Sequence, residues 1–271
     1  MPGDTARGLA QGPPLVEFEN VTVVRGTTRM LNSVTLSLCE GENVAILGPN
    51  GAGKSSLVKA ITREYYPVIA EEPVTFRFHG EDIWDVFDLR SFIGIVSNDL
   101  QYTFTRTITG HEVILSGFFS SIGLFNQEIT PDMEEKAKAI ERLLGIERLA
   151  DRPMNSLSSG EARRFLIGRA LVPGPATLLL DEPTSSLDLS ALHTFRQAMR
   201  TIAQSGTSIV LVTHNLHDII PEITRVVMMK DGRIFGDGEK MAMLTDKKIG
   251  RLFSVPVHVR EEDGWYYATG Y

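Results

Sequence analysis

The sequence predicts an α/β fold in which a mostly parallel sheet is accompanied by an antiparallel β portion and is split by a mostly helical insert. Apolar and polar residues roughly alternate over 15–24 and 34–38, as they do in half-buried strands. Helical patterns replace the strand signal between about 102 and 169. Three apolar runs with few polar positions are typical of strands that are covered on both faces: 44–47, 177–180 and 209–212.

These patterns divide the chain into four expected parts. Residues 1–14 are rich in Gly and Pro and lack periodicity, so we expect a flexible leader. Residues 15–101 and 170–240 are expected to form one discontinuous α/β core, and 102–169 the helical insert. Residues 241–271 are expected to add a short helix and a hairpin.

Two local signals place elements inside these parts. A charged amphipathic helix is predicted over 133–144, with Thr130 as its cap and Gly145 at its end. In the C-terminal extension, strands are predicted over 255–259 and 265–268, joined by a turn at 263–264.

Composition restricts the class of function. The chain has 271 residues, of which 42% are apolar, enough for a sizeable core. Its net charge of -7 offers no excess of Lys and Arg, so nucleic acid is not expected as a partner. Cys39 is the only cysteine, which excludes an internal disulfide. Because no run reaches the ~18 to 20 apolar residues of a bilayer span, we expect a cytoplasmic protein that reaches a membrane only through a partner.

A phosphate-binding motif stands between a predicted strand and a predicted helix. The segment from Gly48 to Ser55 satisfies G-x-x-x-x-G-K-[ST]. Its glycines let backbone N–H groups turn toward a triphosphate, and the helix adds the positive end of its dipole. Lys54 is expected to reach the β- and γ-phosphates, and Ser55 to offer a hydroxyl to Mg²⁺. The residues predicted to contact the nucleotide here are Gly48, Pro49, Asn50, Gly51, Ala52, Gly53, Lys54, Ser55 and Ser56.

Two carboxylates follow the predicted strand 177–180. Asp181 and Glu182 stand at its C-terminal edge, where ligands bind in open α/β sheets. Such a pair alone is as often a solvated turn. In a chain that also has a phosphate loop, we expect Asp181 to hold Mg²⁺ and Glu182 to orient or deprotonate the attacking water.

A second helix start is rich in groups that bind anions. The residues 158–161 read Ser-Ser-Gly-Glu and lead into a helical run over 162–171. One interpretation is a second phosphate-binding end. The other is an ordinary helix capped by Ser158, with Glu161 in its first turn.

These motifs together resemble those of ABC (ATP-binding cassette) ATPases. With Ser-Leu-Asp at 186–188 and Val-Thr-His at 212–214, they look like the phosphate loop, signature, acidic strand, D-loop and switch histidine of that family, in the same order. The resemblance implies a P-loop NTPase core of the RecA-like type and a Mg²⁺-dependent ATPase. It further implies a head-to-tail homodimer, in which the signature of one copy completes the ATP site of the other. The residues assigned by resemblance are Ser158, Ser159, Gly160, Glu161 and Asp188 for the partner's nucleotide, and His214 for the γ-phosphate.

The chain departs from the family at three places. The family usually has a glutamine that touches Mg²⁺ where this chain has Asn98, one methylene shorter, and Gln101 could take over that contact. An aromatic residue often stacks on adenine where this chain has Arg25, whose guanidinium could stack on a base or simply face solvent. The signature reads Ser-Ser-Gly-Glu where Ser-Gly-Gly-Gln is commonest.

The process that the ATPase powers is less clear from the sequence. Aromatic residues gather within 113–125, a neighbourhood that in similar transporters receives a helix of the membrane subunit, but they could equally fill the insert's own core. Details of the insert and tail look similar to a bacterial single-cassette branch that is grouped with iron-chelate and molybdate importers. We therefore expect an importer subunit for a metal chelate or oxyanion, working with transmembrane permease subunits and a substrate-binding protein. The alternative is a soluble regulatory ATPase without transport; a P-loop kinase would have no use for the signature and the switch histidine.

Overall fold

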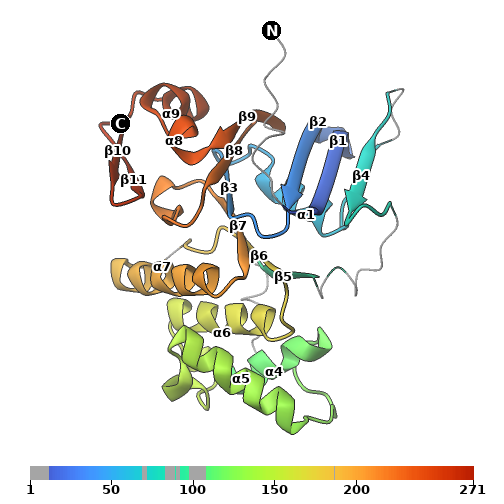
Figure 1. Cartoon of the computed structure of the whole chain (residues 1–271), viewed down its shortest axis with the longest axis vertical. Coiled ribbons are helices and arrows are strands. Elements are labelled where there is room, and N and C mark those ends of the chain that lie inside the picture. The colour runs from blue at the N-terminus through green and yellow to red at the C-terminus, as the bar shows by residue number, and fades with distance from the viewer. Residues whose placement is uncertain (1–11, 69–71, 83–88, 90–91, 98–107, 186) are drawn as a thin grey trace. The chain divides into compact units, whose positions relative to one another are not determined.

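The computed structural model describes residues 12–68, 72–82, 89, 92–97, 108–185 and 187–271. It consists of two compact units, which are described separately (Figure 1). The first comprises Met1–Val86 and Ser208–Tyr271, and the second comprises Phe87–Thr207.

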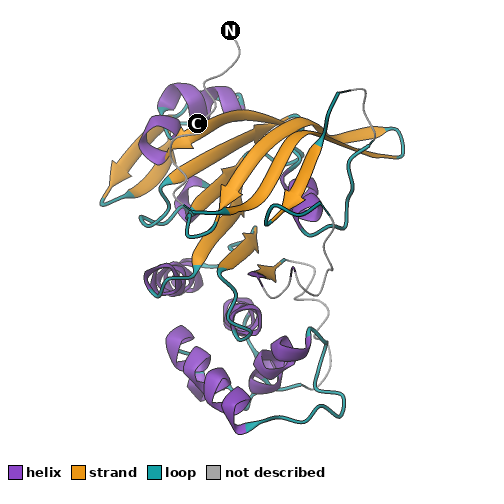
Figure 2. Cartoon of the chain, turned by 45° about the vertical axis from the view of Figure 1, so that its right-hand side comes forward, coloured by secondary structure: helices purple, strands orange, loops and turns teal. Residues whose placement is uncertain are grey.

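An antiparallel sheet forms one part of the first unit (Figure 2). Its order is β2 (Thr28–Cys39), β1 (Pro14–Arg25) and β4 (Thr75–Phe78). Phe18 of β1 lies opposite Phe76 of β4, and their rings stack with centroids 4.8 Å apart. The half-buried alternation predicted for β1 and β2 is confirmed, whereas β4 was not predicted from the sequence.

Parallel strands form the other part of the first unit. β7 (Ser208–Thr213), β3 (Val44–Leu47) and β8 (Arg225–Lys230) pair in parallel, and β9 (Arg233–Glu239) adds an antiparallel edge to β8. Every residue of β3 and β7 is buried, so the prediction of strands covered on both faces is confirmed. Helix α1 (Lys54–Ile61) begins after the loop that follows β3.

The C-terminal residues of the first unit form short elements. They are the 3₁₀ turn η4 (Leu216–Asp218), α8 (Lys240–Met243), α9 (Asp246–Phe253) and the hairpin of β10 (His258–Glu262) with β11 (Trp265–Thr269). β10 begins three residues later than the predicted strand 255–259. Pro256 lacks an N–H, and the ladder begins only where His258 pairs with Thr269.

The second unit combines a strand pair with helices. β5 (Ile93–Val96) pairs in parallel with β6 (Thr177–Asp181). The helices are α4 (Gly110–Leu115), α5 (Pro131–Leu144), α6 (Ser159–Leu171) and α7 (Leu189–Gln204), with short 3₁₀ turns η1 (Ser116–Phe119), η2 (Glu147–Leu149) and η3 (Met154–Ser156). The cap at Thr130 and the left-handed end at Gly145 are confirmed for α5. Together with the sheets, these helices confirm the predicted α/β class with its antiparallel portion and helical insert.

Helices α4, α5 and α6 pack around apolar side chains and one polar cluster. Phe165 of α6 is fully buried against Gly110, where an added Cβ would lie 2.4 Å from the phenyl ring. The imidazole of His111 lies 2.6 Å from the buried carboxylate of Glu141 and 3.1 Å from that of Glu134, which joins α4 to α5. These contacts hold the helices that precede and include the predicted signature helix in one body.

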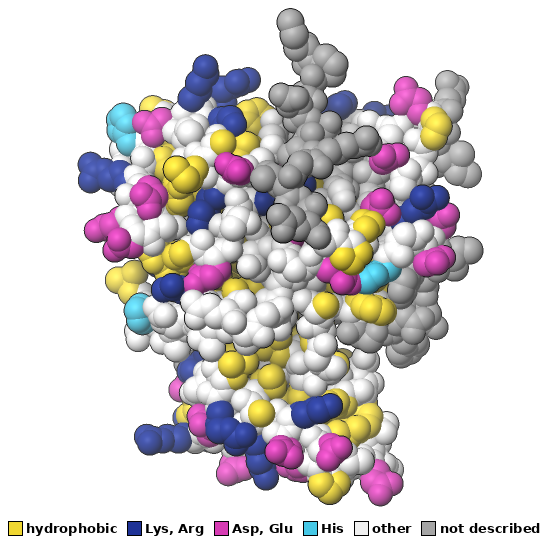
Figure 3. Space-filling model, viewed as in Figure 1, with side chains coloured by type: hydrophobic (Ala, Val, Ile, Leu, Met, Phe, Trp, Pro, Cys, Tyr) yellow, Lys and Arg dark blue, Asp and Glu magenta, His cyan; other side chains and the backbone are white. Residues whose placement is uncertain are grey.

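The molecular surface and the helix lengths agree with the composition. On the face shown in Figure 3, Lys and Arg side chains are interspersed with Asp and Glu side chains. Within the described part of the chain, each helix is too short or too polar to cross a lipid bilayer.

Candidate functional site

The loop between β3 and α1 closes tightly against its own unit. A Cβ added at Gly48 would lie 2.3 Å from the carbonyl oxygen of Met229, so only glycine fits there. Gly53 has φ 98 in the left-handed region, which lets the chain turn directly into α1. The predicted phosphate loop therefore has the backbone shape that the motif requires.

Lys54 lies inside this loop. Its ammonium donates to the carbonyl oxygens of Gly48 at 2.9 Å and Pro49 at 3.1 Å, and the residue is only 4% exposed. Two carbonyls thus hold a positive charge within the turn of the loop. A charged hydrogen-bond donor in this loop could bind a phosphate strongly.

The start of α1 fits an anionic ligand. No side chain caps it, so its first N–H groups are open to an incoming acceptor. Ser55 is exposed at this start and Ser56 is buried. A glycine-lined turn, an uncapped helix start and an enclosed ammonium together fit a nucleoside triphosphate. The hydroxyl of Ser55 and the carboxylate of Asp181 are oxygen donors, the kind that Mg²⁺ accepts.

In the second unit, the acidic pair stands where β6 ends. Asp181 is the last residue of the strand, and both carboxylate residues are partly exposed. Glu182 has φ 47, a left-handed conformation that costs a non-glycine residue of order 1–3 kcal/mol. The guanidinium of Arg163, a residue of α6 that is 5% exposed, donates to the carbonyl oxygen of Glu182 at 3.3 Å. The backbone of the predicted base is thus fixed from the signature helix.

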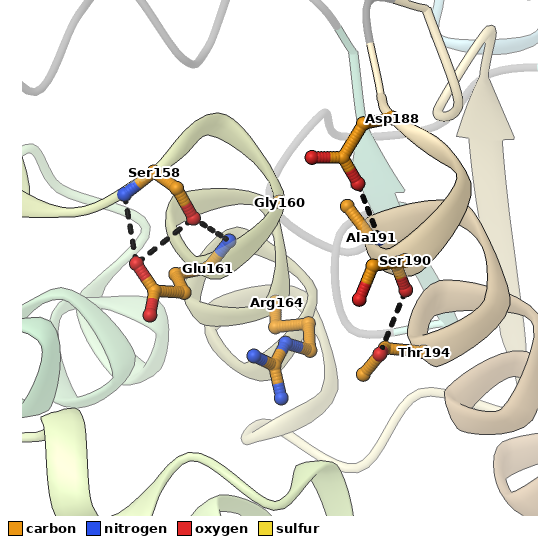
Figure 4. A pocket seen from close by; sticks show the side chains of 8 residues that line it. All are labelled: Ser158, Gly160, Glu161, Arg164, Asp188, Ser190, Ala191 and Thr194. Atoms are coloured by element: carbon orange, nitrogen blue, oxygen red, sulfur yellow. Dashed lines mark hydrogen bonds between the residues drawn. The ribbon is translucent and has the colours of Figure 1, made fainter.

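The residues of the predicted signature form a capping box at the start of α6 (Figure 4). The backbone N–H and the hydroxyl of Ser158 each donate to the Glu161 carboxylate at 2.8 Å, and the Glu161 N–H donates back to that hydroxyl at 3.3 Å. The backbone and hydroxyl hydrogen bonds from Ser158 lower the pKa of Glu161. The capped-helix interpretation is therefore confirmed for this state, and it leaves the anion-binding interpretation as a proposal.

An open pocket of about 220 Å³ lies between the starts of α6 and α7. Ser158, Gly160 and Glu161 line it from α6, and Asp188 lines it beside α7 (Figure 4). The carboxylate of Asp188 accepts from the N–H of Ala191 at 2.8 Å and so caps α7. Two capped helix starts thus border the same space, which the guanidinium of Arg164 and the carboxylates of Glu161 and Asp188 also line.

Gly160 lets the two helix starts approach. A Cβ at Gly160 would lie 2.8 Å from the Cβ of Ala191, closer than two carbon atoms can pack. We expect Gly160→Ala to lower the free energy of unfolding by about 1–3 kcal/mol, because α6 and α7 must move apart. Adding Ala191→Gly to the same chain should restore most of that loss in thermal unfolding. A single variant as stable as the wild type would contradict this account of the pocket.

The last two predicted residues lie in the first unit. His214 is exposed directly after the buried strand β7. Arg25 is exposed at the end of β1, where its guanidinium donates to the hydroxyl of Tyr65 at 2.6 Å and lies 5.7 Å from the centre of that ring. Arg25 therefore does not simply face solvent but forms a pair with Tyr65.

The structure brings some of the predicted residues together within each unit. Gly48–Ser56 form one loop, and Ser158, Gly160, Glu161 and Asp188 share one pocket. Asn98 and Gln101 lie outside the described residues. The sequence interpretation missed Tyr65 and Arg163. Tyr65 and Tyr66 form an aromatic pair that is visible in the sequence after the helix that follows the phosphate loop. Nothing in the local pattern links Arg163 to Glu182.

Comparison with known families identifies the fold and the activity. Residues 31–185 match the family model described as ABC transporter. The chain belongs to this family. An ABC protein from Bacillus subtilis strain 168, the uncharacterized ATP-binding protein YlmA, is 36% identical over 90% of this chain and 93% of its own length. The hemin import ATP-binding protein HmuV from Rhodococcus jostii strain RHA1 is 30% identical over 92% of this chain and 83% of its own.

Solved ABC cassettes have the same fold. The ADP conformation of the cassette MJ1267 has a TM-score of 0.73 at 25% identity and covers 88% of this chain and 98% of its own. The cassette MJ0796, dimeric and bound to ADP and Pi, has a TM-score of 0.65 at 27% identity and covers 83% of this chain and 98% of its own. The chain is therefore a nucleotide-binding ABC ATPase, the ATP-binding subunit of an ABC transporter, and the regulatory alternative without transport is not favoured.

Proposed function

We propose that two copies of this chain bind ATP with Mg²⁺ between them and hydrolyse it to drive import of a metal chelate or an oxyanion through separate membrane subunits. The observation that carries the proposal is a pair of helix starts, because the N–H groups and dipole at a helix start favour anions. One is the uncapped start of α1 behind the phosphate loop, and the other is the start of α6 in an open pocket. In the proposed dimer, the first start binds the nucleotide of its own copy and the second faces the nucleotide of the other copy.

Within one copy, the loop from Gly48 to Ser56 holds the phosphates. Its backbone N–H groups and the ammonium of Lys54 neutralise the triphosphate. Ser55, Asp181 and Asn98 would hold Mg²⁺, which supplies positive charge to the phosphate oxygens when bound. Arg25, held by Tyr65, offers a flat guanidinium on which a nucleobase can stack.

Glu182 and His214 act on the attacking water. Glu182 accepts its proton or orients it, and His214 contacts the γ-phosphate. The contact from Arg163 to the Glu182 main-chain carbonyl helps to hold the backbone of the base at its unusual angle. A fixed base needs less reorganisation at the moment of reaction.

The second copy closes the site. Ser158, Ser159, Gly160 and Glu161, together with Asp188, approach the phosphates held by the first copy. The dimer of the MJ0796 cassette with ADP and Pi supports this arrangement. One chain carries one phosphate loop and one signature. In the proposed dimer, each ATP site therefore takes its phosphate loop from one copy and its signature from the other.

The cargo and the membrane partner are proposed from the relatives and from one exposed side chain. HmuV is named as a hemin importer, and hemin is a metal chelate. In the helical part, Phe125 is 63% exposed whereas Phe118 and Phe119 are half-buried. An exposed phenyl ring that follows half-buried aromatic residues suits a contact with a helix of the permease.

Native co-purification in detergent tests the transporter assignment. We expect the tagged chain to retain a polytopic membrane protein. We also expect the gene for a substrate-binding protein to lie beside the gene for this chain. Phe125→Ala should reduce the retained membrane protein about fivefold or more, as loss of an interface anchor does. Met241→Ala, which removes a side chain from a residue 77% exposed in the other unit, is the matched control and should change nothing. Recovery of the chain without any membrane protein would contradict the proposal.

A further inference from the structure

The segment after β7 makes a tight turn that carries His214. The N–H of Asn215 donates to the hydroxyl of Thr213 at 3.0 Å, and the same hydroxyl donates to the carboxylate of Asp218. The side chain of Asn215 accepts from the N–H of His217 at 3.1 Å. Leu216 and Asp218 are buried within 4% exposure. These hydrogen bonds join His214 to the residues of η4, so a displacement of η4 would also move the backbone at His214.

The C-terminal hairpin is what packs there. β11 packs against η4. The ring of Tyr267 meets the imidazole of His217 edge to face, with centroids 5.1 Å apart and an interplanar angle of 64°. Aromatic contacts of this geometry stabilise a pair beyond the burial of its surface. The residue three positions after His214 is thereby fixed by the extension.

A buried lysine makes the second connection. The ammonium of Lys240 donates to the carbonyl oxygens of Ile220 at 3.4 Å, Pro221 at 2.9 Å and Gly264 at 3.4 Å, and it lies 5.6 Å from the ring centre of Tyr266. The first two carbonyls follow η4, and the third belongs to the turn between β10 and β11. Burial lowers the pKa of this lysine, while the charges of Glu222 and Glu261 raise it, and the three carbonyls replace part of the water around the ammonium.

The hairpin depends on these contacts in turn. A two-stranded hairpin is marginal in isolation, and β10 is almost wholly exposed. In β11 the ring of Tyr266 is buried, at 6% exposure. The hairpin and the turn after β7 therefore stabilise each other.

We propose that the C-terminal hairpin braces the turn that carries His214, and that Tyr267 and Lys240 are positioning residues for ATP hydrolysis. The inference rests on the proposed function, in which His214 contacts the γ-phosphate. Without the brace the turn samples other arrangements, and His214 spends less time in the competent one. Nucleotide binding by the loop around Lys54 does not use these contacts and is retained.

Steady-state kinetics on the full-length chain test the brace. Tyr267→Ala and, separately, Lys240→Met should lower kcat about tenfold while KM and the ATP dissociation constant stay unchanged. Tyr267→Phe keeps the ring and should restore kcat. Tyr271→Ala, at a residue that is 81% exposed, is the matched control. Should Tyr267→Ala not fold, Lys240→Met carries the same test, and wild-type kcat in either folded variant overturns the proposal.

A double-mutant cycle separates the brace from the role of His214. If the hairpin acts through His214, Tyr267→Ala should reduce kcat no further in a His214→Ala chain. An additive loss would show that the hairpin acts by another route and would overturn the inference. Full turnover by His214→Ala alone would instead remove the histidine from the proposed function, whatever the hairpin variants do. Amide hydrogen exchange should also quicken over 214–220 in Tyr267→Ala.

Discussion

Glu182→Gln is expected to bind ATP with Mg²⁺, to form a long-lived dimer and to turn ATP over at less than about one hundredth of the wild-type rate. A positioned general base contributes about 10²–10⁴ in rate, and glutamine cannot take up the proton. The amide has nearly the shape of the carboxylate, so the contact from Arg163 to the main-chain carbonyl and the backbone at φ 47 should persist. In the proposed mechanism the dimer assembles with ATP and separates only after hydrolysis, so it should accumulate in this variant.

Light scattering at saturating ATP and Mg²⁺, paired with a phosphate-release assay, measures both effects. Glu135→Gln removes the same charge from an exposed position of α5 and should behave as wild type. A Glu182→Gln chain that remains monomeric under these conditions would contradict the nucleotide-sandwich mechanism. One that hydrolyses ATP at the normal rate would show that another group acts as the base.

Lys54→Ala is expected to weaken ATP binding by more than about a hundredfold. The ammonium is held within the loop by the carbonyls of Gly48 and Pro49, where it can reach the phosphates. Hydrogen bonds to a charged group contribute roughly 1.5–3 kcal/mol each. Loss of two such bonds from the ammonium to the phosphates therefore corresponds to about a hundredfold or more in affinity. Truncation also removes the contacts that stiffen the loop in the absence of nucleotide.

Equilibrium binding of a fluorescent ATP analogue measures the loss, and thermal unfolding confirms that the variant is folded. Lys247→Ala, on the exposed face of α9, is the matched control. Unchanged affinity in Lys54→Ala would refute the assignment of the phosphate loop.

Much of this architecture could be predicted because it is encoded locally. The buried runs of β3, β6 and β7, the cap at Thr130 and the left-handed end at Gly145 each depend on a few neighbouring residues. The phosphate loop could be predicted equally well, because the backbone conformation of the loop requires glycines at fixed positions. Helix α7 was missed although its apolar residues Phe195, Ala198, Met199 and Ile202 have helical spacing, so the sequence did carry that signal.

Other features depend on contacts between distant residues and leave no local pattern. The pairing of Arg25 with Tyr65 spans 40 residues, and the contact of Arg163 with the Glu182 carbonyl joins a helix to the end of a strand. Lys240 reads as an exposed lysine in the sequence, yet it is buried among carbonyls of three residues. The roles of the site residues stay predictions until the variants above are measured.

The internal hydrogen bonds at the start of α6 have a consequence for selectivity. The Glu161 carboxylate already accepts from both donors of Ser158, so an external anion cannot use these donors while the capping box is intact. An incoming ligand must displace this resident carboxylate, and a singly charged ion has little advantage over it. A polyphosphate carries several negative charges, which the positive end of the helix dipole attracts. We therefore expect the start of α6 to favour a ligand with several negative charges over a singly charged anion.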